Sequence, residues 1–138
     1  MGLTMFCKKT GTEYRLGYMG FMILRLQVAT CLNSEYGEEY GTFFKTAPWK
    51  RNCDKLNQIA TRLIREKSKN KKIFDFLVQD DIGGKISYGA AKVIYDTING
   101  KCEDFKIGYS ETKNPFTWQQ FIDLLKECYE HKSDLVWR

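Results

Sequence analysis

Apolar side chains recur at helical spacing along most of the chain, and the elements that they predict are mainly helices. The most regular patterns predict a helix over residues 48–69 and another that starts at Thr117. The pattern over 20–32 is apolar on most sides, which is typical of a helix in the centre of a fold. Shorter patterns predict helices over 72–79 and 87–99. The chain is therefore expected to be mainly α-helical, with four to five helices.

Residues typical of helix ends support these boundaries. Ser87 is a good N-cap, and Asn99 followed by Gly100 is a typical C-terminal stop. Thr117 and Gln120 have the spacing of a capping box, in which each side chain bonds the backbone N–H of the other residue. Both helices should therefore begin where their apolar patterns begin.

Strand-like alternation is confined to short segments. Residues 3–8 and 135–137 are expected to pair, which would bring the two termini together in a small sheet. Residues 105–109 alternate weakly and predict a further short strand. Residues 33–47 carry glycines and aromatics without a regular pattern, so a loop with at most one helical turn is expected there. The expected fold class is mainly α, or α+β with a small sheet.

Length and composition predict one compact domain over residues 1–138. A chain of 138 residues can bury an ordinary core, and 43% hydrophobic with 14% aromatic residues is too rich a composition for disorder. The whole chain has two prolines, which argues against a long linker between separate domains.

The five cysteines argue against a metal site. They are widely spaced without a Cys-x-x-Cys pair, and His131 is the only histidine. Their pattern fits free thiols in a reducing compartment. The sequence has no secretory signal and no apolar stretch long enough to cross a bilayer. We therefore expect a cytoplasmic protein with no cofactor, metal or membrane partner.

The sequence offers no convincing catalytic set, so we expect no enzyme activity. Cys128 and His131 lie three residues apart on one predicted helix, but Cys128 belongs to the apolar stripe of that helix. The stretch 83–87 differs from the phosphate-binding loop of nucleotide triphosphatases. Gln79 and Ile86 occupy the positions where that loop needs a glycine and a hydroxyl residue.

Two basic, glycine-bearing segments that open helices, residues 8–25 and 83–89, are the main signs of a binding site. The start of a helix offers unpaired backbone N–H groups and a partial positive charge, and glycines let an anionic ligand approach. Tyrosines in both segments are candidates to stack on a base. Ordinary turns and tyrosines that cover the rim of the core are the alternative interpretation. The candidate ligand-binding residues are Lys9, Arg15, Gly17, Tyr18, Gly20, Gly83, Gly84, Lys85, Ser87 and Tyr88.

Much of the net charge of +5 is concentrated in residues 62–72. A run of this kind is usually a solvated helix end, where cations complement the helix dipole. Nucleic-acid binding through the same run is the alternative.

Three stretches of the chain, residues 1–10, 17–21 and 84–89, carry a resemblance to one family. With these stretches the chain resembles small uncharacterised proteins of Gram-positive bacteria and their phages, over most of its length. The resemblance implies an origin in a phage or mobile element and carries no functional residue with it. By analogy with other small phage proteins, it also implies binding that counters host defence.

The sequence favours a non-catalytic binding protein that holds a phosphorylated small molecule, such as a nucleotide immune signal, and sequesters it. A sequestered ligand is deeply buried, and subunit interfaces are convenient for that, so a homo-oligomer is expected. One alternative is a protein-binding inhibitor or immunity protein that contacts a host protein through the aromatic residues of 36–44. A further alternative is a nucleic-acid-binding protein that uses residues 62–72.

Overall fold

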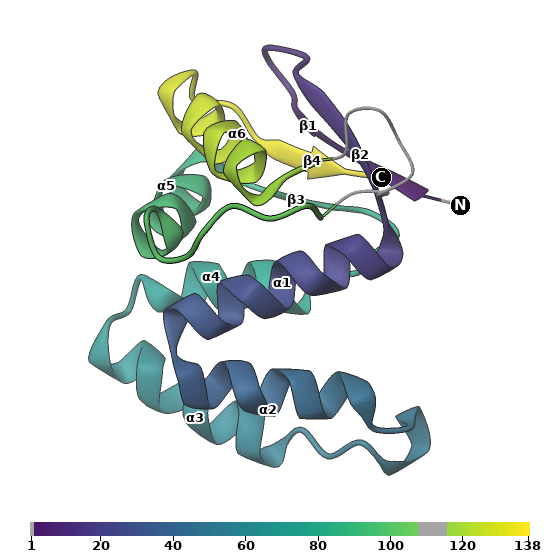
Figure 1. The fold of residues 1–138 in the computed structure, drawn as a ribbon. Coiled ribbons are helices and arrows are strands. Elements are labelled where there is room, and N and C mark those ends of the chain that lie inside the picture. Colours follow the sequence, from purple (N-terminus) through teal and green to yellow (C-terminus); the bar gives the residue numbers. More distant parts are fainter. Residues whose placement is uncertain (1, 108–115) are drawn as a thin grey trace.

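A small antiparallel sheet brings the two termini together, as the sequence predicts. The computed structural model describes residues 2–107 and 116–138 (Figure 1). Its strands are β1 (Gly2–Cys7), β2 (Glu13–Gly17), β3 (Gly84–Ile86) and β4 (Leu135–Trp137). They lie in the order β2-β1-β4-β3, and each neighbouring pair is antiparallel. In the central pair, Met5 of β1 lies opposite Trp137 of β4.

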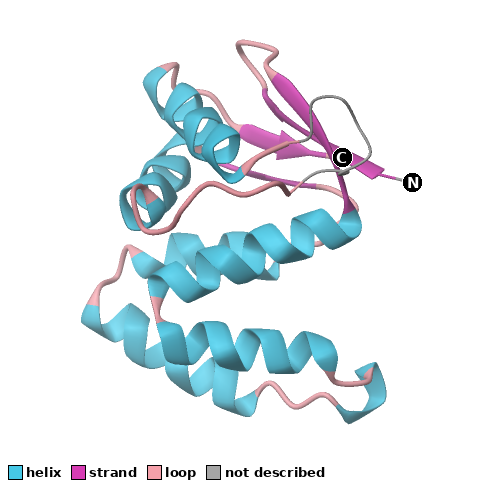
Figure 2. Cartoon of the chain, in the orientation of Figure 1, coloured by secondary structure: helices cyan, strands magenta, loops and turns pink. Residues whose placement is uncertain are grey.

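Helices make up most of the described chain and confirm the mainly helical α+β fold class (Figure 2). The described residues form six α-helices and one short 3-10 turn, η1 (Pro48–Lys50). The helices are α1 (Tyr18–Leu32), α2 (Ser34–Lys45), α3 (Asp54–Glu66), α4 (Asn70–Val78), α5 (Tyr88–Ile98) and α6 (Trp118–Glu130). Figure 1 shows α1 and α4 in a middle layer, with the sheet, α5 and α6 on one side and the α2–α3 pair on the other.

The core lies where the sheet meets the middle layer of helices. Leu3, Met5 and Cys7 alternate along β1 with half-buried residues, so one face of the strand is buried. On the same buried face, the ring of Trp137 packs against Phe21 of α1 and Phe76 of α4, with centroids 5.4 and 5.5 Å apart. These contacts fix α1 and α4 relative to the sheet.

The segment predicted as a loop, residues 33–47, is largely the helix α2. Asn33 caps it by accepting a hydrogen bond from the backbone N–H of Tyr36 at 2.9 Å. Tyr36 and Tyr40 lie four residues apart and form a narrow buried stripe. A side chain at Gly37 would meet Thr30 of α1, so this glycine lets α1 and α2 pack closely. Gly37, one of the glycines that obscured the helical pattern, therefore serves helix packing.

Several predicted boundaries are wrong. Pro48 begins only η1, and α3 starts at Asp54, whose backbone N–H donates to the side chain of Asn52 at 2.8 Å. Strands β2 and β3 fall in the two segments that were predicted as glycine loops. In the segment predicted as a strand over 105–109, Lys106 makes an isolated bridge to Thr117, and residues 108–109 lie outside the described residues.

The predicted helix caps are confirmed. The hydroxyl of Ser87 accepts a hydrogen bond from the backbone N–H of Ala90 at 3.2 Å. Thr117 and Gln120 form the reciprocal capping box at 3.1 and 3.0 Å. Short polar side chains therefore set the starts of α5 and α6.

Gly20 in α1 permits a close approach that no larger residue allows. A Cβ at this position would lie 2.5 Å from the carbonyl oxygen of Ile107. We expect Gly20→Ala to lower the free energy of unfolding by about 2 kcal/mol, because overpacking a tight contact forces the backbone to shift. Gly41→Ala in α2 is the matched control, since its Cβ would meet only Leu26 Cδ1 at 3.4 Å.

In the control, the helix propensity of alanine is expected to stabilise the protein by roughly 0.5–1 kcal/mol. Urea unfolding followed by circular dichroism measures both variants. Equal stabilities for Gly20→Ala and Gly41→Ala would contradict the close approach.

Candidate functional site

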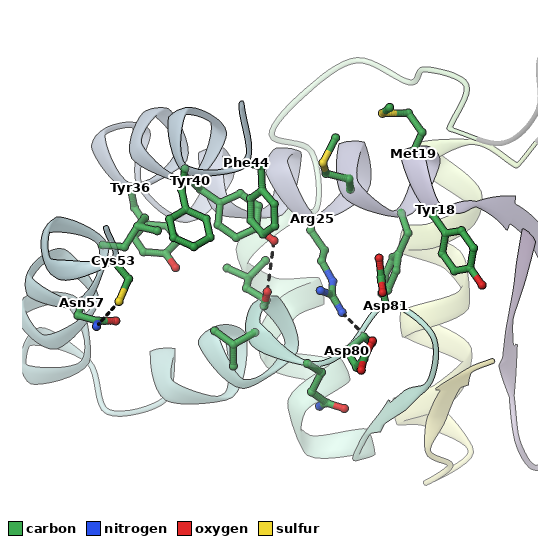
Figure 3. A pocket seen from close by; sticks show the side chains of 17 residues that line it. Tyr18, Met19, Arg25, Tyr36, Tyr40, Phe44, Cys53, Asn57, Asp80 and Asp81 are labelled. Carbon is green, nitrogen blue, oxygen red and sulfur yellow. Dashed lines mark hydrogen bonds between the residues drawn. The ribbon is translucent and has the colours of Figure 1, made fainter. Parts of the chain in front are cut away.

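A cavity of about 600 Å³ lies between α1, α2, α4 and the start of α3, and the loop that follows α4 closes one side (Figure 3). Its size is within the range of about 300–1,000 Å³ typical of small-molecule sites. Aromatic side chains dominate the wall. They are Tyr18, Phe21, Tyr36, Tyr40, Phe43 and Phe44. We call this cavity the Arg25 pocket, after the only Lys or Arg side chain among its lining residues.

Helix α2 supplies the aromatic end of the pocket through residues spaced by one helical turn. The ring centroids of Tyr40 and Phe44 are 4.7 Å apart, and Tyr36 packs edge-on against Phe74 of α4 at 4.9 Å. The hydroxyl of Tyr40 donates a hydrogen bond to the backbone carbonyl of Leu77 at 3.2 Å. Aromatic packing and this bond hold α2 against α4.

The two buried phenols keep their protons at neutral pH. Burial raises the pKa of Tyr36 to about 12, and the nearby Tyr40 adds to the effect. Burial also raises the pKa of Tyr40 to about 12, although Arg25 opposes the shift. The aromatic end therefore carries neutral phenols rather than phenolates.

Arg25 of α1 lies between the aromatic end of the pocket and two aspartates (Figure 3). Only 7% of its surface is exposed, which is unusual for an arginine. Its guanidinium carbon lies 4.1 Å from the ring centroid of Phe21, and Phe76 and Trp137 are at 5.6 and 5.9 Å. Contacts with aromatic faces stabilise the cation but use none of its N–H groups.

The guanidinium of Arg25 has few hydrogen-bond partners. Nη2 donates a long bond of 3.5 Å to the backbone carbonyl of Asp80, and buried Nε has no partner within the described structure. Among residues 2–107 and 116–138, no carboxylate lies within 4.0 Å of it. Burial lowers the pKa of Arg25, and Tyr40 opposes that shift through its charge and a hydrogen bond of its hydroxyl, followed by the charges of Asp81 and Asp80. A buried charge is normally paired, so this cation is under-paired.

Asp80 and Asp81 follow α4 and form the acidic end of the pocket. The carboxylate of Asp80 accepts a hydrogen bond from the backbone N–H of Ile82 at 3.0 Å. The backbone carbonyl of Asp80 also accepts one from the indole Nε1 of Trp137 at 3.0 Å. The core tryptophan therefore fixes the loop that faces Arg25.

The structure does not bring the two predicted glycine segments into one site. Arg15 lies on β2 and Lys85 on β3, the two opposite edges of the sheet, with β1 and β4 between them. Lys9 lies in the β1–β2 turn, where its backbone N–H donates to Ser133 at 3.0 Å. Of the predicted residues, only Tyr18 lines the Arg25 pocket.

The backbone of both glycine segments is occupied by structural contacts. Gly17 lies opposite Gly2 in the sheet, and Gly20 packs against Ile107. A Cβ at Gly84 would lie 2.5 Å from the ring of Trp137.

The backbone of Lys85, next to Gly84 on the edge strand β3, is also hydrogen-bonded. The side-chain amide of Gln79 accepts a hydrogen bond from the backbone N–H of Lys85 at 3.1 Å and donates one to its carbonyl at 2.8 Å. Ser87 caps α5, while Gly83 and Tyr88 are exposed beside it. These segments therefore serve strand pairing, helix capping and close packing.

Sequence reasoning missed Arg25 and the two aspartates as site residues. Arg25 interrupts the apolar pattern over 20–32, and a charged residue inside such a pattern is the signal that was available. The aromatics of 36–44 were recognised, but as an outward contact surface.

Comparison with protein-family models, with curated proteins and with solved structures gives no match to this chain. No helix in the described part of the chain is both long and apolar enough to cross a membrane. Residues 2–107 and 116–138 hold no group of three His, Cys, Asp or Glu side chains suited to a metal ion.

Proposed function

We propose that this is a non-catalytic binding protein that holds a phosphorylated small molecule, in particular a nucleotide, in the Arg25 pocket. The observation that carries the proposal is the under-paired guanidinium of Arg25, 7% exposed, in the wall of a 600 Å³ cavity. A guanidinium matches the geometry of phosphate and carboxylate oxygens and binds them with charge-assisted hydrogen bonds. A bound anion would supply the partner that the protein itself does not.

The aromatic end of the pocket suits the other half of such a ligand. Phe44 lies on one side of Arg25 and is half-buried, so part of its ring is available to a base whose phosphate contacts the guanidinium. Tyr36 and Tyr40 are buried in the wall beside it. Stacking of a base on an aromatic side chain contributes roughly 1–3 kcal/mol. The proposed role is sequestration of a nucleotide immune signal, in keeping with the resemblance to phage proteins.

Homo-oligomer formation remains part of this proposal. Met19 and Val78 line the pocket and are largely exposed, so a second subunit could cover them together with the pocket mouth.

The protein-inhibitor alternative has less support, because Tyr36 and Tyr40 are each only 3% exposed and unavailable to a protein partner. In the basic run, Arg62 is paired with Glu35 at 3.6 Å, and its other cations are exposed.

Isothermal titration calorimetry with cyclic and linear nucleotides tests the proposal. We expect at least one nucleotide to bind, with inorganic phosphate binding much more weakly because it lacks a base. The bound nucleotide should be released intact when the protein is denatured. If no nucleotide binds, or if the released molecule is cleaved, the proposal fails.

Arg15→Ala and Lys85→Ala are the control variants, because both residues are exposed cations on the sheet edges outside the pocket. Each removes the same charge as a substitution of Arg25 would. We expect both to bind the nucleotide as tightly as the unmodified protein. A tenfold or greater loss in either would instead place the ligand at the glycine segments that the sequence first indicated.

A further inference from the structure

The two ends of the Arg25 pocket differ in chemistry. One end is formed by aromatic side chains of α2, and the other by the carboxylates of Asp80 and Asp81, with Arg25 between them (Figure 3). A nucleotide that fills the pocket would place its base at the aromatic end and its phosphate at Arg25. Any group attached beyond that phosphate would face the two aspartates.

The balance of charge in the pocket restricts the anionic group. Among the described residues of the wall, Arg25 is the only cationic side chain, whereas Asp80 and Asp81 bring two negative charges. One phosphate can pair with the guanidinium. Each further phosphate would have no cation left and would approach the two exposed carboxylates, where like charges repel.

A group beyond the phosphate must be compatible with two carboxylates. Asp80 is held in place, because its carboxylate accepts from the N–H of Ile82 and its carbonyl accepts from Trp137. Ionised carboxylates only accept hydrogen bonds, and so do the oxygens of a further ionised phosphate, so the two groups cannot bond each other.

We infer, on the basis of the proposed function, that the ligand carries a single phosphate, and that Asp80 and Asp81 select against polyphosphates. Arg25 attracts the phosphate, and the two aspartates repel ligands that carry further phosphates. The buried and under-paired guanidinium of Arg25, which carries the proposed function, places the single phosphate next to the two aspartates.

Calorimetry with two nucleotide series, adenosine and guanosine, tests this inference. Each series contains the 5′-monophosphate, the 3′,5′-cyclic monophosphate and the 5′-triphosphate, measured without divalent cations. We expect the best monophosphate to bind at least tenfold more tightly than the triphosphate of the same base. In the Asp80→Asn/Asp81→Asn double variant, the ratio of the triphosphate Kd to the monophosphate Kd should fall about tenfold. Asparagine keeps the shape of the side chain and removes the charge that repels further phosphates.

Asp75→Asn is the matched control, since Asp75 is exposed on α4 outside the pocket. It should leave the ratio unchanged. A triphosphate that binds as tightly as the monophosphate, or a ratio that the double variant does not alter, would overturn the inference while the proposed function stands. If neither series binds at all, the proposed function fails and the inference fails with it.

Discussion

Replacing Arg25 with methionine is expected to weaken nucleotide binding at least a hundredfold, with no loss of stability in the unliganded protein. Charge-assisted hydrogen bonds contribute roughly 1.5–3 kcal/mol each, and a phosphate held by two of them would lose both. Calorimetry on Arg25→Met measures this loss. Arg25→Lys is the informative comparison, because it keeps the charge but cannot form two parallel bonds to one phosphate. The affinity of Arg25→Lys for the nucleotide should lie between those of the unmodified protein and of Arg25→Met.

The unchanged or raised stability of Arg25→Met follows from the surroundings of the side chain. The guanidinium is buried among Phe21, Phe76 and Trp137 with few hydrogen bonds and no paired carboxylate, so it bears a desolvation cost that its contacts only partly offset. Well-packed apolar residues in place of buried charges are often neutral or stabilising, by about 1–4 kcal/mol. Urea unfolding measures the difference. A loss of more than about 2 kcal/mol would show that Arg25 is a structural residue of the core instead of a binding residue.

The sequence predicted the helices whose apolar stripes and capping residues lie within a short stretch of the chain. Helices α3 and α6 have regular apolar stripes, and the capping box at Thr117 identifies the start of α6. The third strand could not be predicted in this way. β3 has three residues, and its partner, β4, begins at Leu135, about fifty positions further along the chain. Such pairing depends on tertiary contacts that no short window contains.

The candidate site was harder to predict, because a glycine beside a helix start can indicate either an anion site or close packing. A glycine beside a helix start permits an anion to approach the backbone, but it equally permits close packing. Gly20 against Ile107 and Gly84 against Trp137 belong to the second kind. Arg25 and Asp80 are 55 positions apart, and tertiary packing of α1 and α4 around Trp137 brings them together.

Trp137→Ala is expected to lower the free energy of unfolding by about 3–5 kcal/mol, the range for truncating a large buried aromatic residue. Trp137 is 0% exposed and connects three parts of the molecule. Its ring packs on Phe21 and Phe76, and its indole N–H bonds the carbonyl of Asp80 at 3.0 Å. Since small proteins are stable by only about 5–15 kcal/mol, the variant should be close to its unfolding threshold.

Two further variants separate the contributions of the Trp137 ring and its hydrogen bond. Trp137→Phe keeps an aromatic ring and removes the N–H that holds Asp80, so it should cost about 1–3 kcal/mol and also weaken nucleotide binding as the loop facing Arg25 loosens. Trp49→Ala is the control, because Trp49 is 82% exposed and its loss should change stability by no more than about 0.5 kcal/mol. Urea unfolding and calorimetry give both readouts. If Trp137→Phe stays fully stable and binds normally, the Asp80 loop is held without the indole, and the proposed link between the core and the pocket is wrong.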